Sequence, residues 1–89
     1  VKFMYSVKLL FRAGEGESYL EQEKVQKNLD AAMVSADEMA YYSVGYGLED
    51  WDKIADFGIM GKLYYFYPHK DDDEGDPNVK YVIRVVRTN

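Results

Sequence analysis

The stretch VKFMYSVKLLFR, residues 1–12, decides how the fold is predicted. Apolar and polar side chains alternate along it with a period of two, which is typical of a β-strand with two different faces. One face carries Val1, Phe3, Tyr5, Val7, Leu9 and Phe11, and the other carries Lys2, Met4, Ser6, Lys8, Leu10 and Arg12. This stretch therefore predicts a strand, and the glycine-containing segment 13–17 after it predicts a turn.

Two later stretches alternate in the same way. Residues 78–88 place Val79, Tyr81, Ile83 and Val85 on one side, opposite Lys80, Val82, Arg84 and Val86. Residues 54–67 place Ala55, Phe57, Ile59, Leu63, Tyr65 and Tyr67 in one phase and Met60, Lys62, Tyr64 and Phe66 in the other. The glycines at 58 and 61 indicate a bulge or a bend within this stretch. Because a single loop joins the two stretches, we expect them to form an antiparallel hairpin.

Residues 18–44 have the composition of a helical segment. Two capping-box patterns lie in it, Ser18 with Glu21 and Ser35 with Glu38. These patterns predict two helices in succession, which end at the glycines 45 and 47. In residues 21–28, however, Val25 is the only apolar side chain, so a polar edge strand is the alternative there.

Together these elements predict an α+β fold in a single domain, residues 1–89. We expect a three-stranded, mainly antiparallel sheet with the helical segment on one face, in the order β-α-α-β-β, or β-β-α-β-β if residues 21–28 are a strand. The sheet side of the predicted core consists of Phe3, Tyr5, Val7, Leu9, Phe57, Ile59, Leu63, Tyr81, Ile83 and Val85. The helical side consists of Leu29, Ala32, Met33, Ala36, Met39 and Ala40.

The composition narrows the class of protein. The 89 residues carry 11 basic and 16 acidic side chains, a net charge of −5, and no cysteine. The lack of cysteine excludes a disulfide framework, thiol catalysis and a zinc–thiolate site, and it favours a reducing, cytoplasmic location. No apolar run approaches the about 18 residues that indicate a membrane-spanning helix, and no signal peptide is visible.

The charge is unevenly placed along the chain. Residues 1–12 and 78–89 each carry three basic side chains and no acid, whereas residues 13–77 hold all 16 acids against 5 lysines, a net charge of −11. An acidic whole disfavours non-specific binding to nucleic acid or to an anionic membrane. A protein partner could therefore bind either the basic end segments or the acidic middle of the chain.

The second face of the predicted sheet is the first candidate site. A two-layer fold leaves this face in water, yet the alternation places apolar side chains on it: Met4, Leu10, Met60, Tyr64, Phe66, Val82 and Val86. Basic side chains lie between them: Lys2, Lys8, Arg12, Lys62, Lys80 and Arg84. An exposed apolar patch of this size indicates an interface with a partner or with a second copy. The alternatives are that lysine and arginine stems merely cover the patch, or that the face stacks single-stranded bases, although the sequence signature of RNA-recognition modules is absent.

A cluster of aromatic and acidic residues is the second candidate. It consists of Tyr41, Tyr42, Tyr46, Glu49, Asp50, Trp51 and Asp52. Tyrosine and tryptophan are frequent anchors at interfaces, and acids around them suit a basic partner surface. The alternative is that one or two of these aromatic rings close the end of the core.

An acidic run between the last two predicted strands is the third candidate. It consists of Asp71, Asp72, Asp73, Glu74 and Asp76. A calcium loop of the EF-hand type is excluded, because no register brings glycine to position 6 and glutamate to position 12. The run predicts a solvated hairpin loop, with an acidic finger that imitates phosphates as the alternative.

The sequence offers no set of catalytic residues. His69 is the only histidine, and it has neither a cysteine nor a suitably placed serine as a partner. The Gly45-Tyr46-Gly47 segment lacks the spacing of a phosphate-binding loop. We therefore expect a protein that is not an enzyme and that has no catalytic residues, no metal site and no cofactor.

In composition, the chain resembles the small, acidic, tyrosine-rich, cysteine-free inhibitor proteins that phages encode, anti-CRISPRs among them. The residues that carry this resemblance are the acidic run 71–76, the turn Glu49-Asp50-Trp51-Asp52 and the nine tyrosines. The resemblance implies a non-catalytic protein that blocks a host nucleic-acid-binding or nuclease complex by direct contact, in the host cytoplasm. The basic end strands depart from a pure DNA mimic, which would be acidic throughout.

The function predicted from the sequence is thus protein binding. The leading prediction is the phage-type inhibitor, and its partner is a protein with a basic surface. The first alternative is a structural or regulatory subunit that self-associates, with a homodimer as one form of it. The second alternative is a single-stranded nucleic-acid binder that uses the sheet face.

Overall fold

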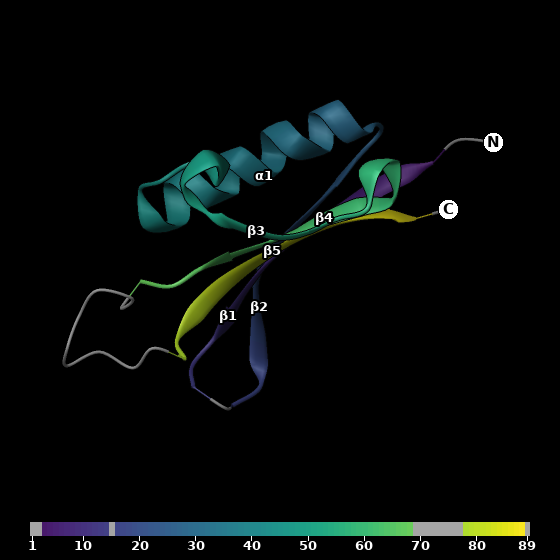
Figure 1. The fold of residues 1–89 in the computed structure, drawn as a ribbon. Helices are drawn as coiled ribbons and strands as arrows, with labels where there is room; N and C mark the ends of the chain where they lie inside the picture. The colour runs from purple at the N-terminus through teal and green to yellow at the C-terminus, as the bar shows by residue number, and fades with distance from the viewer. Residues whose placement is uncertain (1–2, 15, 69–77, 89) are drawn as a thin grey trace.

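The computed structural model describes residues 3–14, 16–68 and 78–88. Within them, five strands form one antiparallel sheet, and one α-helix, α1 (Leu29–Val44), lies across a single face of it (Figure 1). The strands are β1 (Met4–Arg12), β2 (Ser18–Gln26), β3 (Asp52–Asp56), β4 (Gly61–Phe66) and β5 (Lys80–Thr88), in the spatial order β2-β1-β5-β4-β3. The α+β class and the helix on one face are confirmed, whereas the predicted three-stranded sheet and two helices are wrong in these details.

The alternative of a polar strand before the helix is confirmed. β2 pairs with β1 from Ser18 opposite Arg12 to Gln26 opposite Tyr5. Nearly every side chain of β2 is exposed, because it is an edge strand with little to bury on either face. A helix built from these residues would have lacked an apolar stripe to hold it on the sheet.

The helix begins later than the capping-box patterns predicted. Asn28 caps it, since its Oδ1 accepts a hydrogen bond from the Ala31 backbone N–H at 2.8 Å. Gly45, with φ of 83°, ends it as predicted. Ser35 is not a cap: it lies buried in the middle of α1, and its Oγ accepts a hydrogen bond from Gln26 Nε2 at 2.7 Å.

The stretch predicted as one strand, residues 54–67, contains a reversal of the chain. A short 3₁₀ turn, η2 (Gly58–Met60), separates β3 from β4, and the Phe57 N–H donates to the Gly61 carbonyl at 2.9 Å. The hairpin pairs Ala55 with Leu63, so these two side chains share a face as the alternation predicted, but Tyr64 lies opposite Ile83 and Phe66 lies opposite Tyr81. The side chains of Tyr64 and Phe66 consequently belong to the helix face, not to the second face where the alternation had placed them.

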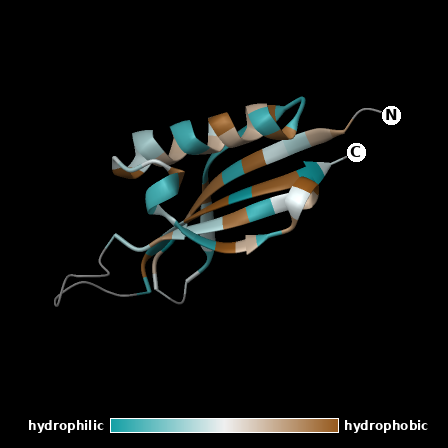
Figure 2. Ribbon diagram, turned by 45° about the horizontal axis from the view of Figure 1, so that its top comes forward, coloured by the Kyte–Doolittle hydropathy of each residue, from teal (hydrophilic) through white to brown (hydrophobic). Residues whose placement is uncertain are grey.

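The core lies between α1 and the middle strands of the sheet. Tyr5, Val7 and Leu9 of β1 and Ile83 and Val85 of β5 are buried there, as predicted. Three alanines of α1 face them, Ala32, Ala36 and Ala40, with Met39 beside them, so the helix backbone lies close to the sheet. Hydrophobic and hydrophilic residues alternate along the strands in Figure 2.

Several expected core positions differ. Phe57 and Ile59 are 67% and 64% exposed, because they lie at the β3–β4 reversal rather than within a strand. Leu63 lies opposite Arg84 on the face away from α1, because Tyr64 and Phe66 are the β4 residues that lie opposite the core side of β5. Tyr64, Trp51 and Leu48 take part in the core instead.

Candidate functional site

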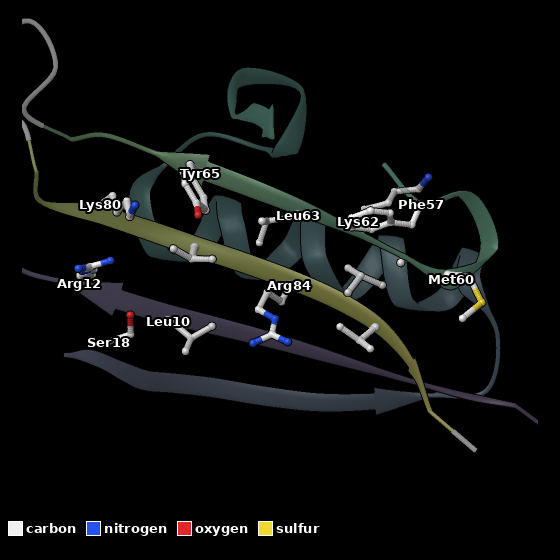
Figure 3. A pocket seen from close by; sticks show the side chains of 14 residues that line it. Leu10, Arg12, Ser18, Phe57, Met60, Lys62, Leu63, Tyr65, Lys80 and Arg84 are labelled. Carbon is white, nitrogen blue, oxygen red and sulfur yellow. The ribbon is translucent and has the colours of Figure 1, made fainter. Parts of the chain in front are cut away.

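The face of the sheet opposite α1 carries the candidate site. None of the described residues packs over this face, which β1, β5 and β4 build together. We call it the open sheet face, and it consists of Leu10, Arg12, Leu63, Tyr65, Lys80, Val82, Arg84 and Val86. The register brings them together, since Leu10 lies opposite Val82 and Leu63 lies opposite Arg84. Figure 3 looks onto this face, with α1 behind the sheet.

A groove of about 540 Å³ runs over the open sheet face. Its floor is largely aliphatic, with Val82 only 8% exposed and Leu10 and Leu63 half-buried beside it. Met60 and Phe57 project at the end formed by the β3–β4 reversal (Figure 3). Val82 is thus almost removed from water, Leu10 and Leu63 keep part of their surface in contact with it, and Met60 and Phe57 keep most of theirs.

The charged side chains that line the groove are all basic. Arg12 Nε donates a hydrogen bond to the Gly16 carbonyl at 3.1 Å, and Lys80 Nζ lies 4.1 Å from the centre of the Tyr65 ring. Arg84 is exposed and has no hydrogen bond or ion pair with the described residues. Among the described residues that line the groove there is no carboxylate.

A second, smaller hollow continues the open sheet face toward β2. It shares Arg84 and Val86 with the main groove, and it is completed by Ser6, Lys8, Glu23, Val25 and Thr88. Lys8 Nζ lies 3.7 Å from Glu23 Oε2, so part of the charge there is balanced. The apolar floor and the basic side chains therefore extend together across the β2–β1–β5–β4 part of the sheet.

Lys62 at the rim of the groove is held by Asp56. Lys62 Nζ lies 2.7 Å from Asp56 Oδ1, and the same carboxylate accepts hydrogen bonds from the Gly58 N–H at 2.9 Å and from Lys53 Nζ at 3.2 Å. These hydrogen bonds, that of Lys62 first, lower the pKa of Asp56 well below its ordinary value of 3.8. The Asp56 carboxylate thus fixes the position of Lys62 and stabilises the β3–β4 turn.

Because the pKa of Asp56 is lower in the folded chain, its carboxylate contributes stability above pH 3.8, and that contribution is lost as the pH falls through the folded-state pKa. In an NMR titration, we expect Asp56 to titrate below 3.8 and to move toward 3.8 in the variant Lys62→Met. An Asp56 titration that Lys62→Met leaves unchanged would show that the Gly58 N–H and Lys53 hold the carboxylate without Lys62.

The helix side of the molecule presents the acidic and aromatic residues predicted as a partner site. We call this surface the acidic helix surface, and it consists of Asp30, Glu38, Tyr41, Tyr42, Tyr46, Glu49 and Asp50, all exposed. Tyr42 is 82% exposed and packs edge-on against Tyr41 at 5.6 Å between ring centres. Asp37 lies beside them, where its Oδ1 accepts the Leu48 N–H at 2.9 Å.

Two residues predicted for this cluster lie elsewhere. Trp51 is 5% exposed and packs on Phe66, and its indole N–H donates to the Tyr46 carbonyl at 3.1 Å. It therefore closes the end of the core, which was the alternative, and its ring is not available to a partner. Asp52 starts β3 opposite Tyr65, at the edge of the open sheet face. The acidic residues Asp71, Asp72, Asp73, Glu74 and Asp76, and also His69, lie outside the described residues.

The structure changes the membership of the predicted sheet-face site only at β4. Leu10, Val82, Arg84 and Val86 lie on the open sheet face, and Met4 lies in the same phase of β1, as predicted. Leu63 and Tyr65 replace Tyr64 and Phe66. The alternation grouped these residues correctly, with Leu63 and Tyr65 on one face and Tyr64 and Phe66 on the other, but both groups are apolar, so it did not show which of them faces α1.

The described residues contain no group of three or more histidine, cysteine, aspartate or glutamate side chains placed to hold a metal ion. In that same part of the chain, no helix has the length and apolar character needed to cross a membrane. Comparisons of the sequence with protein-family models and with curated proteins, and of the fold with solved structures, gave no match.

Proposed function

We propose that this chain is a non-catalytic module that binds another protein through its open sheet face. The observation that supports this is the groove, which combines an aliphatic floor with an exposed Arg84 that has no partner among the described residues. Burying an exposed apolar side chain fully is worth about 1.5–3 kcal/mol, and side chains that are already half-buried gain less. A partner would therefore gain most by covering the exposed Phe57, Met60 and Val86 around the floor.

The lining of the groove favours a protein over a single-stranded nucleic acid. Proteins that bind single strands stack bases on exposed aromatic rings along a positive track. Here the floor is made of Leu10, Leu63 and Val82, and the ring of Tyr65 already lies against Lys80. The net charge of −5 also opposes a polyanion.

A second role is favoured by the acidic helix surface. Residues 29–50 carry five acids and no lysine or arginine, and three exposed tyrosines lie among them. Such a surface suits a basic protein groove that normally holds nucleic acid. In this role the chain would act as the resemblance implies, as a phage-type inhibitor of a nucleic-acid-binding or nuclease complex in the host cytoplasm.

The primary proposal is tested with a charge placed in the groove. We expect Val86→Glu to weaken partner binding at least about tenfold, because it buries a carboxylate in an apolar contact. The measurement is quantitative affinity capture with mass spectrometry, followed by titration of the purified partner. Tyr19→Glu is the matched control, since Tyr19 is an exposed aromatic residue of β2 opposite Phe11, on the other side of the sheet.

Equal binding by both variants and the unchanged protein would exclude the open sheet face as the interface. Loss of binding in charge-reversal variants of Glu49 and Asp50, with Val86→Glu unaffected, would favour the second role. A saturable, salt-sensitive titration with a single-stranded oligonucleotide that Val86→Glu abolishes would instead show a nucleic-acid platform.

A further inference from the structure

The two faces of the molecule are complementary to each other. We propose that the open sheet face of one copy of this chain binds the acidic helix surface of a second copy, so that copies stack head to tail. This inference rests on the proposed function, since it names the protein that occupies the open sheet face. It assigns a use to the acidic helix surface as well.

The charges of the two faces have opposite sign. On the sheet side, the basic residues are Lys8, Arg12, Lys80 and Arg84, and the acids among the described residues are Glu23, paired with Lys8, and Asp52 at the edge. On the helix side, residues 29–50 contribute Asp30, Asp37, Glu38, Glu49 and Asp50 without a basic residue, and Lys24 of β2 borders them. α1 and the open sheet face lie on opposite sides of the sheet (Figure 1). The acidic and the basic residues named above are therefore on opposite sides of the molecule.

The same charges oppose a symmetric dimer. In a two-fold contact between two open sheet faces, the same patch is present on both sides of the interface. Arg84 lies on β5 at the middle of the sheet, so Arg84 of one copy would lie near Arg84 of the other in an apolar contact. Like charges placed together in this way oppose association. The head-to-tail arrangement puts carboxylates there instead.

The two faces also differ in form. α1 forms a ridge with Glu38, Tyr41 and Tyr42 on its outer side, and the groove on the sheet is about 540 Å³ with an aliphatic floor. A helix laid in an apolar groove is a common mode of recognition. In the proposed contact, the tyrosine rings of one copy cover the groove floor of the next copy at a low cost in conformational entropy. Glu38 of the first copy then lies near Arg84, at the centre of the second copy's groove.

This arrangement has a consequence for assembly. A head-to-tail contact uses different surfaces on its two sides, so each bound copy still offers one free face of each kind unless the ring closes. The mass of the assembly should therefore rise with concentration beyond that of a dimer. It should fall with salt, because part of the attraction is between exposed charges.

The test uses purified protein and a pair of charge reversals, Arg84→Glu and Glu38→Lys, at exposed positions. In sedimentation equilibrium at about 0.02 M salt, we expect the unchanged protein to exceed twice its monomer mass of 10.3 kDa at high concentration, and to lose mass at about 0.5 M salt. Each variant alone should stay monomeric, since each places like charges across the contact. An equimolar mixture of the two should associate again, because the reversed pair restores attraction.

Tyr42→Ser is a second variant that does not depend on charge, and it should weaken association at least about tenfold. Circular dichroism of each variant establishes that it is folded. Monomeric behaviour of the unchanged protein at millimolar concentration would overturn the inference, and so would association that Glu38→Lys and Tyr42→Ser leave intact. If the protein stays monomeric while Val86→Glu still abolishes capture of another protein, the inference fails and the proposed function stands.

Discussion

Trp51→Ala is expected to lower the free energy of unfolding by about 3–5 kcal/mol. The indole is 5% exposed, packs on Phe66 with 5.4 Å between ring centres, and donates its N–H to the Tyr46 carbonyl. Truncation therefore leaves a cavity at the end of the core and an unpaired carbonyl. For a chain of this size, total stability is on the order of 5–13 kcal/mol, so the loss is a large part of it.

The measurement is urea unfolding followed by far-ultraviolet circular dichroism, because Trp51 is the only tryptophan and its fluorescence disappears with it. Tyr46→Ala is the matched control: its ring stacks on the same Phe66, but it is 54% exposed, so the loss should be clearly smaller. A stable Trp51→Ala variant with weakened partner binding would contradict the core assignment and make Trp51 a surface anchor.

Gly61→Ala is expected to cost about 3 kcal/mol or more, and to disturb the β4–β5 pairing. A Cβ at this position would clash with the Val85 carbonyl oxygen, which belongs to the main chain and cannot rotate away. The φ angle of 149° is also one that side chains disfavour. Glycine here lets the chain leave the η2 turn and enter the sheet directly beside β5.

Thermal and urea unfolding measure this loss, and Gly58→Ala separates its two causes. Gly58 has φ of 62°, but nothing lies within 4 Å of the Cβ it would gain, so only the backbone strain remains. That strain is about 1–2 kcal/mol. Similar losses in the two variants would show that the predicted clash at Gly61 is relieved by a small shift of β5.

The strands with one buried face were predictable from the sequence. β1 and β5 alternate strictly because one side of each meets α1 and the other meets water, and the alternation places Val7, Leu9, Ile83 and Val85 correctly in the core. β2 gives no such signal, since both of its faces are exposed and its residues are good helix formers. Its pairing with β1, a tertiary contact, decides its conformation.

The candidate site was predicted correctly on β1 and β5 and wrongly on β4. Leu10, Val82, Arg84 and Val86 follow from the alternation of β1 and β5. In β4 both phases are apolar, so the alternation groups Leu63 with Tyr65 and Tyr64 with Phe66 without showing which pair faces α1. The pairing of β4 with β5, a tertiary contact, decides between the two faces.

The position of β5 in the sheet has a consequence for the order of folding. β1 with β2, and β3 with β4, can each pair as local hairpins, but these share no hydrogen-bonded edge until β5 enters between them. β5 pairs with β1, which is far away in the sequence, and Thr88 lies opposite Met4. Before β5 pairs, the two hairpins are therefore unjoined and each keeps an unpaired edge. The sheet closes only when β5 pairs with both β1 and β4, and such non-local closure is slow.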